Sequence, residues 1–493
     1  MNRNIIFYLT VLIVVGGGIL GIIKLGAGLP APIHTESSLA LEHARAATAA
    51  AAVPVATAAP TSAFGAMLAS LTTNLSHPLS HLFIQLLVII AASRVAGGLF
   101  TKMGQPAVVG EMMAGILLGP SLLGWLSPEM FQFVFPTSSL GTLKLLSQIG
   151  VCLFMFCVGM ELDVKQVRNK AHTAVVVSHA SIVAPYFLGV GLAYFVYSSL
   201  AQPGTNFTAF ALFMGISMSI TAFPVLARIL QERGMSQTFL GNTAVTCAAV
   251  DDVTAWSALA FVVAIAGSTS VAGSALNLAL VLVFIVAMIW GLRPMLPRIF
   301  GREELERPDP SKRTLAIVIC SVLVAALCTE VVGIHALFGA FLAGAIMPDV
   351  AGFRHKLAVR VENFSTVLLL PLFFAFTGLR TQIGLLNDFS GWMICLAIIA
   401  VATAGKLGGT AFTARFTGMS WRDSLQLGAL MNTRGLMELI ALNIGYDLGI
   451  LSPRIFAMLV IMALVTTAMT GPLLSLFQRM KVREEAPDRL VRP

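Results

Sequence analysis

Long apolar runs, separated by short polar segments, are the dominant pattern along this chain. A helix that crosses a bilayer needs roughly 20 apolar residues. After residue 78 the chain has thirteen such candidates, of which 335–348 is short. We therefore predict an all-α polytopic membrane protein whose spans are 80–101, 106–126, 143–161, 172–200, 207–230, 237–266, 273–292, 313–330, 335–348, 361–380, 389–413, 423–446 and 454–477.

The N-terminal part of the chain has a different pattern. Arg3 followed by an apolar run predicts a signal peptide or signal-anchor helix at 1–23. Residues 24–78 are rich in Ala, Pro, Thr and Ser and lack patterned apolar surface, so we expect a disordered, exported linker. The transmembrane domain is expected at 79–478, followed by a short cytoplasmic tail at 479–493. The sequence leaves open whether the leader is cleaved.

Composition and charge agree with a membrane protein. The 493 residues are 57% hydrophobic and 11% charged, whereas soluble domains average about 25% charged residues. The net charge of +8 could suit a nucleic-acid partner, but the basic residues follow topology instead. One set of alternate loops, with the C-terminal tail, holds 22 Lys and Arg and the other set holds 3. The positive-inside rule then predicts a cell-membrane protein with a cytoplasmic C-terminus, an exported N-terminal arm and no nucleic-acid partner.

The thirteen spans divide into two groups of six around the seventh span, so the two groups have opposite topology. Transporters commonly use such inverted repeats, in which broken helices meet near the midplane. The fifth member of each group carries helix-breaking residues, at Ser217–Pro224 and at Asn432–Gly435. A simple kink in each helix is the alternative. The matching positions favour a pair of broken helices.

Several charged residues lie near mid-membrane in the predicted spans, and six of them are candidates for a functional site. A charge near mid-membrane costs roughly 2.5–3.5 kcal/mol on insertion scales and usually marks a functional site. Asp251 and Asp252 are adjacent, and helix geometry turns them about 100° apart. A carboxylate there can release a proton and bind a cation in its place, although a buried ion pair that only joins helices is the alternative. The six residues are Glu111, Asp251, Asp252, Lys406, Arg434 and Glu438.

The basic and acidic partners in this set leave several pairings open. Lys406 needs a counter-charge, and Asp251 is the candidate. Arg434 and Glu438 are four residues apart and could pair along one helix, but Gly435 makes that geometry uncertain and Glu111 is an alternative partner for Arg434. Bracing and function are both open for Arg434, Glu438 and Glu111.

At these residues the chain resembles the monovalent cation:proton antiporter-2 family, with CHX-like and NapA-like exchangers of Na+ or K+. The resemblance extends over 80–477. Its motifs are "GEMMAGILLGPSLLG", "FMFCVGMELD", "SMSITAFPVLARIL", "TAVTCAAVDDVTAW", "GIHALFGAFLAGAIMP", "LPLFFAFTGLRT" and a long stretch that begins "MNTRGLMELIALNIGYDLG".

The resemblance implies a thirteen-helix antiporter fold with inverted repeats and two crossing broken helices. It implies a homodimer that exchanges Na+ or K+ for protons, with no cofactor and no enzymatic activity. Asp252 is implied as the proton carrier and the monovalent-cation ligand, with Asp251 as the first acid of a double-aspartate pattern and Lys406 as its partner. Ser219 and Thr221 are implied to line the site.

A cation channel and a non-transporting membrane sensor are the rival functions. A channel needs a filter, such as repeated carbonyl loops or a ring of acids, and no such motif is visible. The exported arm is the best support for a sensor. The sequence leaves open Na+ against K+, the stoichiometry and the pH regulation, although the resemblance to double-aspartate members of the family implies electrogenic exchange.

Overall fold

The computed structural model describes residues 3–30, 77–161, 171–235, 238–266, 271–307, 309–333, 335–350 and 352–479, with four isolated positions between 67 and 75. Most of the predicted linker, the predicted cytoplasmic tail beyond Arg479 and the basic segment at 162–170 lie outside these residues. The described part is nearly all helical, and a single β-bridge joins Ala201 to Leu451 there. The predicted all-α class is confirmed.

One set of helices packs together on one side of the molecule, and we call it the first helix group. Its helices approach closely, for example α5 and α20, where a Cβ on Gly378 would lie 2.0 Å from the carbonyl oxygen of Gly115. Such backbone contact is typical of membrane helices, which pack through small residues. The members are α4 (Pro78–Lys102), α5 (Ala107–Leu118), α8 (Thr137–Glu161), α17 (Lys312–Val332), α18 (Ala336–Ala345), α19 (Phe353–Phe364), η2 (Ser365–Leu369) and α20 (Leu370–Arg380), with the short α6 (Leu123–Leu126) and α7 (Pro128–Val134).

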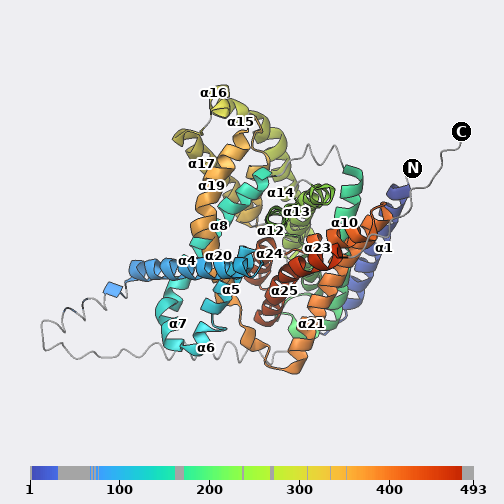
Figure 1. The fold of residues 1–493 in the computed structure, drawn as a ribbon, viewed down its shortest axis with the longest axis horizontal. Helices are drawn as coiled ribbons and strands as arrows, with labels where there is room; N and C mark the ends of the chain where they lie inside the picture. The colour runs from blue at the N-terminus through green and yellow to red at the C-terminus, as the bar shows by residue number, and fades with distance from the viewer. Residues whose placement is uncertain are drawn as a thin grey trace.

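A second helix group forms the other side of the molecule (Figure 1). The additional N-terminal helix α1 (Arg3–Gly26) lies along α10, on the side away from α4 (Figure 1). The members are α10 (Ala171–Leu200), α11 (Phe207–Ser217), α12 (Phe223–Glu232), α13 (Phe239–Ala266), α21 (Phe389–Thr403), η4 (Ala404–Gly408), α22 (Gly409–Phe416), α23 (Trp421–Met431), α24 (Leu436–Asp447) and α25 (Pro453–Gln478).

The two groups are joined covalently through a helix that packs on both. That helix, α14 (Val271–Val286), contacts α13 of the second group and α17 of the first. It continues through a π-helical turn, η1 (Ala287–Leu292), into α15 (Arg293–Phe300) and the short α16 (Arg302–Glu306). Between the groups, α5 also meets α25.

Every predicted span contains a helix. Within the described residues ten helices are long and apolar enough to cross a membrane, and the remaining three spans are the short α18 and the two broken segments. Three predicted boundaries were wrong. The helix predicted from 143 begins at Thr137, because its first turns are polar but still helical. The seventh span continues to Phe300, and the helix predicted from 361 begins at Phe353.

Both predicted breaks are present. The first lies between Ser217 and Phe223, with Pro224 in the first turn of the following half-helix. The second lies between Met431 and Leu436. Gly435 has φ of 124° there, a conformation that residues with a Cβ rarely adopt. The chain can therefore leave and re-enter helical geometry within a few residues at both positions.

Candidate functional site

The two breaks lie against each other. The backbone N–H of Ala222 donates to the carbonyl of Thr433 at 2.9 Å, and Thr221 Oγ1 donates to the carbonyl of Met431 at 3.0 Å. Unwound backbone inside a bilayer needs such partners, because lipid offers none. The predicted crossing of two broken helices is therefore present, and it places Thr221 at the crossing.

Arg434 of the second break extends across to the first. Its side chain is fully buried, and its guanidinium donates to the carbonyls of Ser217 at 2.9 Å and Met218 at 2.5 Å. These carbonyls end α11, where helical partners are missing and the helix dipole favours a cation. The same guanidinium pairs with Glu438, also fully buried, at 2.9 Å. Arg434 thus connects both breaks.

A second buried ion pair joins α13 to η4. Lys406 Nζ lies 2.9 Å from Asp251 Oδ2, and both side chains are fully buried. Lys406 also donates to the backbone carbonyl of Ser219 in the first break. The lysine lies in a π-helical turn, a feature often found at functional sites. The pair that we predicted for Lys406 is therefore present, and it touches the first break.

Ser181 of α10 completes the surroundings of Asp251, and the sequence did not single it out. Its hydroxyl lies 3.0 Å from Asp251 Oδ1 and 2.8 Å from the carbonyl of Ser178. A hydroxyl has one hydrogen, so it can donate to only one of these oxygens at a time. The available signal was the pair of serines three apart in "VVVSHASIV", but serine is too common in membrane helices to identify a site.

Asp252 follows Asp251 on α13 and is 1% exposed. Ser219 and Thr221, which were expected to line the site, are fully buried in the first break. The Ser219 hydroxyl lies within hydrogen-bond distance of the carbonyls of Gly215 and Ile182, at 2.8 and 3.1 Å. Buried carboxylate, hydroxyl and carbonyl oxygens are the ligands that can coordinate a monovalent cation.

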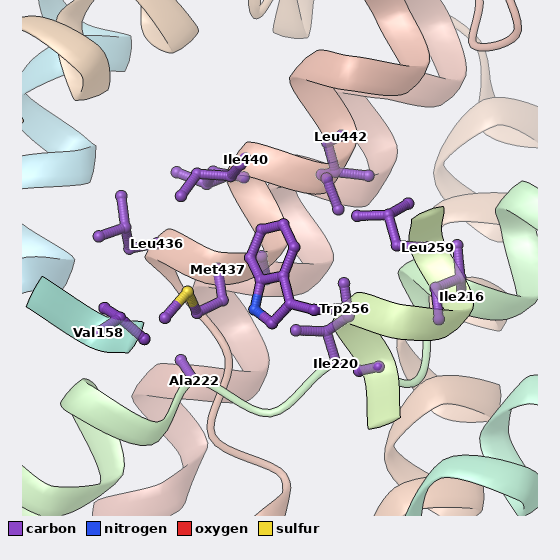
Figure 2. Packing of buried hydrophobic residues seen from close by; sticks show 14 of the residues in the cluster. Val158, Ile216, Ile220, Ala222, Trp256, Leu259, Leu436, Met437, Ile440 and Leu442 are labelled. Atoms are coloured by element: carbon purple, nitrogen blue, oxygen red, sulfur yellow. The ribbon is translucent and has the colours of Figure 1, made fainter. Parts of the chain in front are cut away.

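Trp256 lies one turn beyond Asp252 on α13 and contacts the first helix group. Figure 2 shows its indole between Met437 of α24 and Ile220 of the first break. It is 2% exposed, and its ring lies 5.7 Å from that of Phe338 on α18. The contact between the two helix groups at this level is therefore apolar and aromatic.

Glu111 is not part of this cluster. It lies on α5 and is 7% exposed, with Arg94 and Arg228 as the cations that influence it electrostatically. Among the described residues the acidic partner of Arg434 is Glu438, so the alternative pairing of Arg434 with Glu111 was wrong. Arg434 and Glu438, four residues apart, can still pair because Gly435 is the last residue before α24 begins.

Comparison with known proteins agrees with this architecture. The family described as "Sodium/hydrogen exchanger, transmembrane" matches residues 86–478. The chain belongs to that family, which confirms the resemblance to cation:proton antiporters and the multi-pass membrane class.

Relatives of this chain carry exchanger names. The Na(+)/H(+) antiporter NhaS4 of Synechocystis is 44% identical over 389 residues, which cover 79% of this chain and 95% of that protein. Cation/H(+) antiporter 20 of Arabidopsis thaliana is 38% identical, and K(+)/H(+) antiporter 1 of Saccharomyces cerevisiae is 31% identical. These matches cover 81% and 82% of this chain but only 48% and 47% of the plant and yeast proteins.

One solved structure supports the fold. The sodium proton antiporter MjNhaP1 from Methanocaldococcus jannaschii superposes with a TM-score of 0.60, covering 79% of this chain and 98% of that one. The sequence identity is 12%, so this likeness concerns the fold alone. It agrees with the predicted antiporter fold.

Proposed function

We propose that this protein exchanges Na+ or K+ for protons across a membrane by alternating access, with the cation and the proton competing for Asp252 and its neighbour Asp251. The observation that carries the proposal is the Asp251–Lys406 pair at 2.9 Å, buried beside the crossing of two broken helices. A carboxylate in that position favours either a proton or a cation, because an uncompensated charge in a membrane is costly.

Ser219 and Thr221 support the same proposal. Their hydroxyl hydrogens point to backbone carbonyls, which leaves oxygen lone pairs for a cation. A cation at Asp252 could then be held by carboxylate and hydroxyl oxygens. The relative named as a Na(+)/H(+) antiporter and the one named as a K(+)/H(+) antiporter support either cation as the substrate.

The remaining parts of the proposal concern assembly, location and charge movement. We propose a homodimer in the cell membrane with the C-terminus in the cytoplasm and the N-terminal arm exported. We also propose that each cycle moves two protons per cation, one linked to Asp252 and one to the Asp251–Lys406 pair. Exchange would then respond to membrane potential by about 2.3 kcal/mol per 100 mV for each net charge moved.

Purified protein in liposomes with an internal pH dye tests the exchange. Addition of Na+ or K+ to loaded vesicles should move protons in the opposite direction, and Asp252→Asn should abolish that movement. Asp423→Asn, which removes a carboxylate at the far end of α23 from the crossing, should leave it intact. If proton and cation compete, the apparent KM for the cation should rise by up to about tenfold for each unit of pH decrease.

The same experiment separates the rival functions. A channel would give cation flux without coupled proton movement, and a sensor would give no flux. Normal cation-driven proton flux in Asp252→Asn would rule out the proposed site, while flux that is lost equally in Asp423→Asn would show only that aspartates in general are needed for folding.

A further inference from the structure

A small cavity lies between the two helix groups, and none of its lining residues belongs to the ion-binding cluster. Its volume is about 20 Å³, enough for one water molecule. The first group contributes Ser147 of α8 and His335 at the start of α18, and the second contributes Ile440, Asn443 and Asp447 of α24. All of the helix ends around it are those that the charge pattern predicts to face the outside.

Asp447 lines this cavity and joins the two groups. Its Oδ1 accepts from Arg380 of α20 at 2.7 Å and from Lys144 of α8 at 3.1 Å. Arg380 also donates to Asn443 Oδ1 at 2.9 Å, and Asn443 Nδ2 donates to Thr377 of α20 at 2.8 Å. The C-terminal end of α24 is thus held by four polar contacts to the first helix group.

The aromatic surroundings hold Arg380 in place for these contacts. Its guanidinium lies 4.2 Å from the ring centroid of Phe376, on its own helix, and 5.0 Å from that of Tyr446, on α24. Arg380 is only 14% exposed, whereas Asp447 is 23% exposed and Lys144 is 36% exposed. The contacts are therefore partly screened by water, and such pairs form and break at modest cost.

The helix α24 connects these contacts to the ion-binding cluster. It begins at Leu436, directly after Gly435 of the second break, and ends at Asp447. Its 12 residues span about 18 Å. Glu438, in its first turn, is paired with Arg434 at the crossing. A short rigid helix of this kind transmits any shift of the break to its other end.

We propose that Asp447, held by Arg380 and Lys144, is the residue that closes the outer access route to the ion site, and that this structure is the state in which the route is closed. The cavity beneath Asp447 is the inner part of that route. The proposal rests on the exchange proposed above, because a closed route has a role only if the site must open alternately to each side.

Accessibility of a cysteine introduced into the cavity tests the proposal without any transport. Ser147 is 1% exposed, lines the cavity and lies one turn from Lys144 on α8. Ser147→Cys is nearly isosteric because it only replaces the hydroxyl oxygen by sulfur. A membrane-impermeant maleimide is added to intact cells, and the labelled peptide is quantified by mass spectrometry. Protein that keeps Ser147 provides the background from the native cysteines. Labelling of the introduced thiol should be slow in the Ser147→Cys protein and about fivefold faster when Asp447→Asn is added.

A matched control is available on the same predicted face. Asp388 pairs with Arg454, but both belong to the second helix group, and the pair joins α21 to α25 without crossing to the first group. Asp388→Asn removes one carboxylate and keeps an oxygen that can cap α21, so it should leave labelling of the introduced thiol unchanged. Equal labelling with and without Asp447→Asn, or an equal rise in Asp388→Asn, would overturn the proposal.

Two further variants keep the test decisive. If Asp447→Asn does not accumulate in the membrane, Lys144→Gln removes one of its two cationic partners and should give a smaller rise; no rise would count against the proposal. Combination with Asp252→Asn separates this proposal from the exchange itself. Labelling that still responds to Asp447→Asn in inactive protein supports the access route even if no coupled exchange is found in liposomes.

Discussion

Two ion pairs lie fully buried near the crossing, and they have the same length but different surroundings. Lys406 and Asp251 are 2.9 Å apart, as are Arg434 and Glu438. The first pair joins two helices and has Asp252 and Ser181 beside it. The second joins Arg434 of the second break to Glu438 in the first turn of α24, and its arginine also bonds to two backbone carbonyls of the other break.

The difference distinguishes Asp251–Lys406, a pair that can exchange partners, from Arg434–Glu438, a pair that holds the two breaks together and that we call the brace. Removal of Arg434 would leave a buried carboxylate and two unsatisfied carbonyls at once, so no exchange of partners can occur there cheaply. Asp251 keeps the Ser181 hydroxyl as a second partner, and Lys406 has the Ser219 carbonyl. Each member of that pair can therefore be separated from the other and still have a hydrogen-bond partner.

The largest effect is expected from the brace. Arg434→Gln should lower the free energy of unfolding by about 3–5 kcal/mol, the usual cost of breaking a buried pair from one side. Glu438→Gln should cost less, since Arg434 keeps both carbonyl contacts. Thermal unfolding in detergent measures both. An Arg434→Gln protein as stable as Glu438→Gln would show that the carbonyl contacts contribute little.

Lys406→Gln should have the next largest effect. The free energy of unfolding should fall by about 1–3 kcal/mol, because the amide can still donate to Asp251 but brings no charge. Exchange should become slower and less sensitive to membrane potential, as measured in liposomes at several clamped potentials. If the exchange rate of the wild-type protein does not depend on membrane potential, Lys406 is a permanently charged structural residue and exchange is one proton for one cation.

Ser181→Ala should have a smaller effect, with Ser178→Ala as its matched control. Both hydroxyls are fully buried on α10, but Ser181 contacts Asp251 and, among the described residues, the Ser178 hydroxyl has no hydrogen-bond partner. Loss of the Ser181 hydroxyl should cost about 1 kcal/mol and change the KM for the cation. Ser178→Ala should change neither. Equal behaviour of the two variants would argue against a role for Ser181 at Asp251.

The smallest effect is expected from removal of the segment before residue 78. Its helix α1 packs along α10 and α11 but contributes no residue to either ion pair. A protein that starts near Leu79 should insert and exchange at a normal rate in liposomes. Insertion without exchange would instead give the α1 contact with α10 a part in the function of the second helix group.

The sequence predicted much of the site because a charged residue within an apolar span is unusual and can be recognised one residue at a time. Of the six charges that the sequence placed near mid-membrane, four form two ion pairs and Asp252 is adjacent to one of them, while Glu111 lies elsewhere. The pairing of Arg434 could not be chosen from sequence alone. Glu438 and Glu111 were both acidic and both predicted to be buried, and only the positions of α5 and α24 distinguish them.

The sequence by itself determined the elements: apolar runs of about 20 residues fix the spans, and Pro224 and Gly435 fix the two breaks, because length, hydropathy and backbone freedom are local properties. Only the tertiary structure decided which faces meet. Ser181 meets Asp251 across 70 residues, and Lys144 meets Asp447 across 303. Such contacts depend on how helices rotate and pack against each other, which the periodicity of one helix does not contain.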